Sequence, residues 1–209
     1  MRIDALAARP DRAGRHSVTF SDGSVMRLYS RTIEDFGLYA GLELTDEEMA
    51  ALKTAAEKMS AKMRAVRIVA ASNVSKSDLE QRLIRKGESK TSAREAVAWM
   101  EDLNLLDDRE TACQLVQQCI RKGYGKLRAK QALYEKQISK ELWEEALAEY
   151  PDMTDAITAY LRSHLPGTGD PKQQKKAVDA LLRRGHTYSQ ISRALRSLDL
   201  DTDEFPEEL

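Results

Sequence analysis

The sequence LLDD at residues 105–108, followed by RKGYG at residues 121–125, decides the fold of this chain. Both segments belong to the second of three similar units. The apolar anchors of these units, Leu83, Leu133 and Leu181, are 50 and 48 residues apart. A degenerate repeat of this length indicates that one supersecondary unit is stacked three times, and that the array acts as a surface rather than as a pocket.

Further positions support this alignment. Gly87, Gln137 and Gly185 are equivalent, and an alanine follows nine residues after each of them. Other small or apolar residues keep offsets of six and ten residues: Ala93, Trp143 and Ile191, then Val97, Leu147 and Leu195.

The composition of the 209 residues favours helices in a well-solvated body. Hydrophobic residues make up 42% and charged residues 32% of the chain, with only 10 Gly and 5 Pro, and the mean hydropathy is -0.55. Such a composition is typical of helical proteins. No apolar run approaches the roughly 20 residues that cross a bilayer, and the N-terminus lacks the apolar core of a signal peptide. We therefore expect no membrane contact and a cytoplasmic location.

The two cysteines do not form a disulfide framework. Cys113 and Cys119 stand six residues apart on one expected helix, which places them about 240° apart around its axis. They cannot pair with each other, so reduced thiols are expected, as is usual in the cytosol.

The net charge of -1 conceals a strong asymmetry. Residues 121–136 carry six cations against Glu135 alone, and residues 171–198 carry seven against Asp179. Residues 199–209 carry six acids and no cation. This separation favours anionic partners at the basic helices, while the acidic tail either screens them or stays disordered.

The N-terminal part has the only β-like pattern. Residues 1–15 are small or charged without periodicity, and we expect them to be flexible. Residues 16–29 predict a hairpin that turns at residues 21–24, and a short helix follows from near Thr32 to Gly41. Two strands alone are marginally stable, so this part must pack on another element.

A long helix is expected to begin at the capping box of Thr45 and Glu48 and to reach about Ala71. Apolar residues recur along it at intervals of three and four, which is typical of a coiled coil. Because three heptads rich in Met and Ala make a weak zipper, we favour packing within the chain over dimerisation and expect a monomer. The stripe consists of Met49, Leu52, Ala56, Met59, Met63 and Val66.

Capping signals divide the remainder into further helices. Glycines or Asn104 are expected in the turns, and Pro171 in a first helical turn. Ser139 is expected to cap a helix that carries Trp143 and continues to Tyr150. The expected caps are Ser75, Asp107, Ser139 and Thr187.

We therefore predict an all-α fold: an elongated array of three tandem three-helix repeats of helix-turn-helix type, preceded by a small N-terminal β-hairpin plus helix. One unit is too small for a secure core, so neighbours should bury each other's apolar faces. The expected divisions are 1–44 for the N-terminal extension, 45–106 for the long helix and repeat 1, 107–151 for repeat 2, 152–198 for repeat 3 and 199–209 for the acidic tail.

With these residues the chain resembles the RecX family, the small bacterial modulators of the RecA recombinase, over about residues 65–198. The longer N-terminal portion looks like the extended form of some members. Asn104 and Gln137 stand where glycine is common in the family, and His186 stands where an aromatic residue is usual. The matching residues are Ser75–Leu79, Leu83, Lys86, Gly87, Leu106–Asp108, Ala112, Arg121–Gly125, Arg128, Leu133, Lys136–Ser139, Leu181–Gly185 and Ile191.

The resemblance implies a non-enzymatic regulator in DNA repair, homologous recombination and the SOS response. Family members lie along the groove of the RecA filament on DNA, limit its growth or promote its disassembly, and so depress ATP hydrolysis and strand exchange. A curved row of repeats suits a helical groove, and weak contacts add through effective concentration. We also expect weak binding of single- or double-stranded DNA without sequence specificity.

The candidate contact residues lie in the two basic segments, whose alternative interpretation is simple solvated surface. Tyr124 either inserts into a partner or packs over its turn, and we favour packing. The candidates are Arg121, Lys122, Tyr124, Lys126, Arg128, Lys130, Lys172, Lys175, Lys176, Arg183 and Arg184.

No catalytic, metal or cofactor site is expected. Asp107 and Asp108 resemble a carboxylate pair, yet helix capping explains them. His16, His164 and His186 are scattered, without the spacing of metal ligands. The main rival function is a helix-turn-helix DNA-binding regulator that acts without RecA, and a structural helical adaptor comes third. Sequence-specific reading would need base-edge donors at one exposed helix start, and each unit offers a different set.

Overall fold

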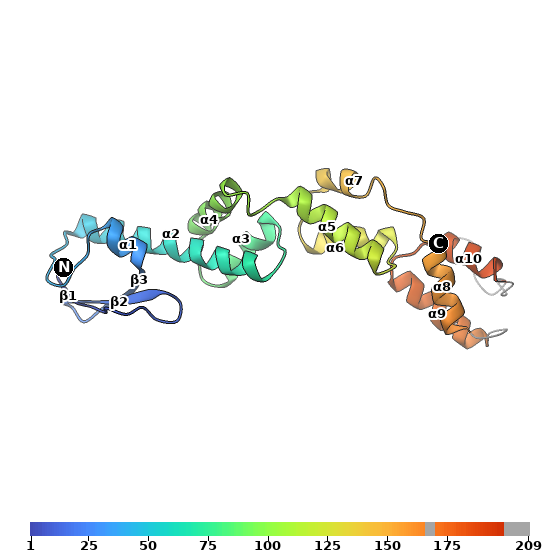
Figure 1. The fold of residues 1–209 in the computed structure, drawn as a ribbon, viewed down its shortest axis with the longest axis horizontal. Helices are drawn as coiled ribbons and strands as arrows, with labels where there is room; N and C mark the ends of the chain where they lie inside the picture. Colours follow the sequence, from blue (N-terminus) through green and yellow to red (C-terminus); the bar gives the residue numbers. More distant parts are fainter. Residues whose placement is uncertain (166–169, 199–209) are drawn as a thin grey trace. The chain divides into compact units, whose positions relative to one another are not determined.

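The computed structural model describes residues 1–165 and 170–198 (Figure 1). The chain divides into two compact units, Met1–Leu106 and Asp107–Leu209, and each is described by itself. The expected loop at 166–169 and the acidic tail at 199–209 lie outside the described residues.

The first unit begins with a three-stranded antiparallel sheet in the order β1-β2-β3. Strand β2 (Arg15–Phe20) and strand β3 (Val25–Tyr29) form the predicted hairpin. The expectation that residues 1–15 are flexible is wrong, because β1 (Ile3–Leu6) pairs with β2 and buries Ile3 completely. The Ile3 backbone is also held on its other side, where its N–H donates to the Leu42 carbonyl at 2.9 Å.

The sheet packs on the start of the long helix, which meets the expectation that two strands need further support. Helix α1 (Ser30–Asp35) follows β3, and α2 (Asp46–Ala71) begins at the predicted capping box of Thr45 and Glu48. One cluster joins the strands to the first two turns of α2. Its buried members are Ile3, Val18, Phe20, Leu28, Leu38, Leu44, Met49 and Leu52.

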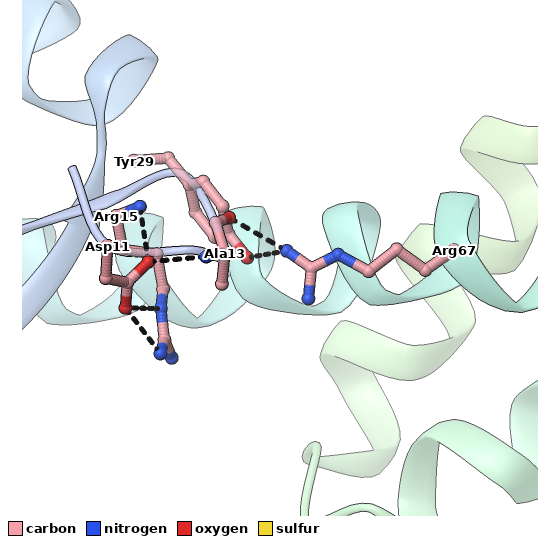
Figure 2. A network of polar contacts seen from close by, with 5 residues as sticks. All are labelled: Asp11, Ala13, Arg15, Tyr29 and Arg67. Atoms are coloured by element: carbon pink, nitrogen blue, oxygen red, sulfur yellow. Dashed lines mark hydrogen bonds and ion pairs between the residues drawn. The ribbon is translucent and has the colours of Figure 1, made fainter.

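A polar network ties the sheet to the C-terminal part of α2 (Figure 2). The Arg67 guanidinium donates to the Ala13 carbonyl at 3.0 Å and to the Tyr29 hydroxyl at 2.8 Å. Beside it, hydrogen bonds from Arg15 hold the pKa of Asp11 down at about 2. The loop between β1 and β2 is therefore bonded to the helix through Arg67, while the Asp11–Arg15 ion pair holds the loop itself together.

Helix α2 continues into repeat 1 with α3 (Lys76–Arg85) and α4 (Lys90–Asp102). The predicted apolar stripe is wrong in this half of α2. Ala61 and Ala65 are fully buried, whereas Met59 and Met63 are only partly covered. The reason is that α4 packs along α2 through its own alanines, and small side chains on both helices allow a close approach.

The second unit contains repeats 2 and 3, so the tandem helical repeats are confirmed. The N-cap of its first helix is Asp107, whose side chain accepts from the backbone N–H groups of Arg109 and Glu110. Thr187 forms a capping box with Gln190. Repeat 2 consists of α5 (Asp108–Arg121), α6 (Lys126–Glu135), the short 3-10 helix η1 (Lys140–Leu142) and α7 (Trp143–Ala146). Repeat 3 consists of α8 (Thr154–His164), α9 (Pro171–Arg183) and α10 (Tyr188–Arg196).

The expected helix from Ser139 to Tyr150 is wrong. Ser139 makes no side-chain cap, and a 3-10 turn and a single α turn take the place of that helix. Two aromatic groups bond to the preceding turns instead: the Trp143 indole N–H donates to the Ile138 carbonyl at 3.0 Å, and the Tyr150 hydroxyl donates to the Tyr124 carbonyl at 2.7 Å. Burial raises the pKa of Tyr150 to about 12.

The expectation that neighbouring repeats share their apolar faces is also wrong for repeats 2 and 3. In the part of the chain that the structure describes, each of them encloses its own apolar cluster, one centred on Leu133 and the other on Leu181. The exact residue ranges of the repeats stay a proposal. Gln137 adopts the left-handed φ of 54° that Asn104 also has, so the turn keeps the glycine geometry without a glycine.

Replacement of Ala65 by Leu should destabilise the first unit by about 1–3 kcal/mol, because the added side chain meets α4 across a filled contact. Met63→Leu, on the partly exposed side of α2, should change stability by less than about 1 kcal/mol. Urea unfolding can be followed through Trp99, which packs on this cluster, in a Trp143→Phe background. A larger loss of unfolding free energy for Met63→Leu would mean that Met63 belongs to the buried face of α2, as the sequence predicts.

Candidate partner-binding site at the junction of repeats 2 and 3

Two turns of the second unit contact each other backbone to backbone. In the turn between α5 and α6, the N–H of Gly125 donates a hydrogen bond of 2.9 Å to the Arg184 carbonyl. The N–H of Leu127 donates one of 3.2 Å to the Gly185 carbonyl. Free N–H groups at the start of α6 thus meet free carbonyls at the end of α9. These helix ends carry opposite partial charges, so the contact is electrostatically favourable.

The contact requires glycine on both sides. A Cβ at Gly125 would overlap the carbonyl group of Gly185, and a Cβ at Gly185 would overlap the backbone nitrogen and Cβ of Arg128. The φ of Gly125 is -78°, which any residue can adopt, so its lack of a side chain serves the contact and not the local backbone.

The sequence contains a signal for this contact, although the repeat alignment alone did not predict it. The second helix of repeat 1 is capped by the Ser75 side chain, and that of repeat 3 by the Asp170 side chain. In repeat 2 the same position holds Gly125, which has no side chain for capping. A glycine where its counterparts carry a capping residue indicates that another chain segment approaches closely.

His186 closes the junction from the side of repeat 3. Its ring is 1% exposed, and Nε2 lies 3.0 Å from the carbonyl oxygen of Gly123. Since a carbonyl only accepts, Nε2 carries the proton, while Nδ1 has no hydrogen-bond partner among the described residues. Burial lowers the pKa of His186, and the nearby Arg184 charge lowers it further, against the opposing effect of the Gly123 hydrogen bond. The ring is therefore neutral at pH 7.

A cleft of about 280 Å³ lies beside the junction, and four of the eleven predicted contact residues line it. Arg128 reaches it from α6, Arg183 and Arg184 from the end of α9, and Tyr124 from the α5–α6 turn. Tyr160 and Ala180 complete the lining. This cleft brings together residues as far as 60 positions apart in sequence, Tyr124 and Arg184.

Two of the three arginines in the cleft are held in place. Arg128 bonds the carboxylate of Glu135 at 3.0 Å, which lowers the pKa of Glu135. The Arg184 guanidinium stands 4.2 Å from the centroid of the Tyr160 ring. The His164 ring stacks on Tyr160 with centroids 3.9 Å apart. Two groups cannot share one side of a ring at this distance, so both faces of Tyr160 are covered.

Tyr124 serves packing and the cleft together. Its ring packs partly against the cluster of repeat 2, and its carbonyl accepts from Tyr150. This is the arrangement that we favoured from the sequence, and it still leaves the residue in the lining of the cleft.

The other seven predicted contact residues are exposed, and the structure does not bring them into the cleft. Among residues 1–165 and 170–198, none of the seven forms an ion pair with a carboxylate. They lie at the end of α5, on α6 and on α9: Arg121, Lys122, Lys126, Lys130, Lys172, Lys175 and Lys176.

A second hollow, of about 490 Å³, lies between α6 and α7 and was not predicted. It is lined by Trp143 and by Tyr134, whose ring is 66% exposed, together with backbone-turn residues around Gln137. Its lining is mainly apolar and aromatic, in contrast to the arginine cleft.

The described residues offer few groups for metal binding or for catalysis. In the described part of the chain, no His, Cys, Asp or Glu residues gather in a group that could hold a metal ion. Burial raises the pKa of the Cys119 thiol, which disfavours its reactive thiolate form. Asp107 is engaged as a helix cap. No helix among the described residues is both long and apolar enough to span a bilayer.

Fold and site together define a class: a tandem three-helix-repeat protein with a cationic cleft between two repeats. The family model described as "RecX, second three-helix domain" matches residues 107–147. The regulatory proteins RecX of Vibrio parahaemolyticus and Vibrio campbellii are each 30% identical over 152 residues, which cover 71% of this chain and 98% of each relative. The chain belongs to the RecX family of regulatory proteins.

Solved structures agree with this fold. A structure titled "Crystal structure of regulatory protein RecX" matches with a TM-score of 0.65 at 17% identity, and the match covers 93% of this chain and 98% of that one. RecX from Lactobacillus salivarius matches with a TM-score of 0.58 at 20% identity, over 69% of this chain and 98% of that one. At these identities the likeness concerns the fold alone.

Replacement of Gly125 by Ser should destabilise the second unit by about 1–3 kcal/mol, because the new side chain overlaps Gly185. Serine is a strong helix N-cap, so without the contact the same change would stabilise α6. The measurement is urea unfolding followed through Trp143 in a Trp99→Phe background. As a control, Gly87→Ser adds a side chain at a left-handed residue with open space around it. It lies in the first unit, so its unfolding is followed through Trp99 in a Trp143→Phe background, and it should cost only about 1 kcal/mol. A stabilised Gly125→Ser chain would contradict the contact.

Stability of the second unit should fall as the pH drops from about 7.5 to 5.5. The folded state lowers the pKa of His186 from its ordinary 6.5, so below that value the unfolded chain binds more protons and is favoured. His186→Phe should remove this pH dependence, whereas His164→Gln, at an exposed histidine, should retain it. The measurement is the free energy of unfolding from Trp143 fluorescence at each pH. An unchanged slope in His186→Phe would assign the titration to other groups.

Proposed function

We propose that this protein binds the RecA recombinase filament on DNA and restrains it, limiting filament growth, ATP hydrolysis and strand exchange. The observation that carries the proposal is membership in the RecX family over nearly the whole length of the relatives. The protein acts as a monomer without catalytic chemistry, in the cytoplasm, where it meets the filament.

The exposed cations of the second unit support a polyanionic partner. A filament on DNA presents negative charge along its length, and charged surfaces of this kind attract an oppositely charged protein over about a Debye length. Each exposed cation contributes little by itself. Many weak contacts on one chain add, because each bound repeat raises the effective concentration of the next.

Restraint follows from differential affinity. A ligand shifts an assembly toward the state that it binds more tightly, and by no more than the difference in the two binding free energies. Repeats joined by a backbone contact such as that of Gly125 and Gly185 hold their contact residues at a fixed spacing. A filament whose protomers match that spacing is favoured over one whose spacing must change during assembly or hydrolysis.

The rival is a helix-turn-helix regulator that binds DNA without the recombinase. Tight turns between second and third helices favour it in repeats 1 and 3. In repeat 2 the third helix is reduced to η1 and the four-residue α7, which is too short to serve as a recognition helix. Repeat 2 also contributes half of the cationic cleft, so the proposed filament regulator uses the features of this chain more fully.

The test is addition of the purified protein to recombinase filaments on single-stranded DNA with ATP. We expect ATP hydrolysis and strand exchange to fall at substoichiometric to stoichiometric amounts. Unchanged rates at equimolar protein would refute the proposed function. The rival requires sequence-selective binding to duplex DNA that persists at high salt.

Replacement of Arg121, Lys122, Lys126 and Lys130 by Gln should raise the concentration needed for half-maximal inhibition by about tenfold or more, because four exposed charges are lost from the partner surface. Circular dichroism should be unchanged, since all four side chains are exposed.

The matched control removes the same charge from the first unit. Arg12, Arg27, Lys53 and Lys90 are exposed cations there, and their replacement by Gln should leave inhibition within about threefold of the unaltered chain. Equal losses in both variants would mean that net charge alone, and not the surface of the second unit, governs the effect.

A further inference from the structure

We propose that the cleft between α6 and α9 binds a backbone phosphate of DNA through Arg128, Arg183 and Arg184, without reading the bases. The inference rests on the proposed function, which supplies DNA as the nearby polyanion. It assigns the nucleic acid to one cleft and not to the basic surface as a whole.

The fold holds several positive charges close together in the cleft. Three guanidinium groups line it, and the lining residues include no carboxylate. Among the residues that the structure describes, Arg128 alone of the three has a carboxylate partner, Glu135, which lies outside the lining. The arginines come from two repeats whose spacing is fixed by the backbone contact of Gly125 and Gly185. Like charges held together in this way repel one another, and a bound anion relieves that repulsion.

Two of the guanidinium groups are ordered before any ligand arrives. Glu135 fixes the Arg128 guanidinium, and the Tyr160 ring fixes that of Arg184. Arginine presents a planar fork of donors that matches the oxygens of phosphate. Side chains that are already ordered lose little conformational entropy on binding. Arg183 is exposed, so it is free to close on the ligand from the solvent side.

The aromatic rings of the cleft offer little open surface on which a base could stack. Proteins that bind single strands usually stack bases on free aromatic faces. In this cleft His164 and Arg184 cover the two faces of Tyr160, and Tyr124 is partly buried against the core of repeat 2. The polar groups of the cleft are guanidinium N–H donors, whose planar fork matches the oxygens of a phosphate.

The exposed lysines around the cleft favour DNA over an acidic protein segment. They continue along both helices away from the cleft, with Lys126 and Lys130 on α6 and Lys175 and Lys176 on α9. No described carboxylate forms an ion pair with any of these four. A strand with one charge per nucleotide can satisfy such an extended series, whereas a protein segment would need acids at matching positions.

The experiment measures binding of the full chain to a fluorescein-labelled oligothymidylate of about 20 nucleotides, without recombinase, by anisotropy at several salt concentrations. Replacement of all three cleft arginines by Gln should weaken binding about tenfold or more, and should lower the salt slope by about 0.7 for each lost phosphate contact. Inorganic tripolyphosphate should compete with the oligonucleotide for the unaltered chain.

Two further variants make the test specific. Lys172, Lys175 and Lys176, on the same helix α9, lose the same charge when replaced by Gln. Because they are separate exposed charges along the strand and not a convergent set, we expect their replacement to weaken binding clearly less than that of the three arginines. Replacement of the three cleft arginines by Lys keeps the charge but not the bidentate geometry, and should weaken binding by an intermediate factor. Trp143 fluorescence in a Trp99→Phe background confirms that each variant is folded.

The outcomes separate this inference from the proposed function. Equal losses in the arginine and lysine variants would overturn it, because the binding would then be diffuse electrostatics. Filament inhibition by a chain that does not bind the oligonucleotide would also overturn it, and would assign the cleft to an acidic segment of the recombinase. Oligonucleotide binding that depends on the arginines, by a chain that leaves the filament unaffected, would uphold the cleft and refute the proposed function.

Discussion

The second unit depends on one close contact, in which the N–H of Gly125 at the start of α6 meets the carbonyls at the end of α9. Because repeats 2 and 3 enclose separate apolar clusters, hydrophobic burial stabilises each repeat but does little to orient one against the other. Hydrogen bonds are directional and short-ranged, so two backbone turns in contact define an orientation that a loose apolar interface would leave free. The residues that we predict to contact a partner take their spacing from it.

This contact also explains several local departures from ideal helix chemistry. Gly125 gives up the side-chain cap that Ser75 and Asp170 provide in the other repeats. His186 is buried with one ring nitrogen that has no partner among the described residues. Each departure costs stability locally, and each follows from the approach of the two turns. Several such losses of local stability in one place are typical of a functional site, where residues are placed for the geometry of the site and not for the best local structure.

Local signals in the sequence predicted most of the helices and the site only in part. Capping boxes at Thr45 and Thr187 are set by residues three apart, so they are visible in the sequence alone. Strand β1 is not predicted because its four residues are too few to show a clear alternation. The sequence does not predict the alanine face of α2, because methionine is the more hydrophobic residue. The short distance between α2 and α4 decides which face is buried, and it favours alanine. The sequence predicts the basic residues as a set, but which of them share a cleft depends on a contact between turns some 60 residues apart.

The position of the charges follows from the same constraint. Arg128 comes one turn after the glycine at the start of α6, and Arg183 and Arg184 come directly before the glycine that ends α9. Once Gly125 and Gly185 touch, these arginines must face a common space, because their backbones are fixed within a turn of the contact. A cationic cleft is thus a geometric consequence of placing basic residues beside the two glycines. Loss of either glycine should separate the arginines without removing a single charge, so junction geometry and anion affinity are expected to fail together.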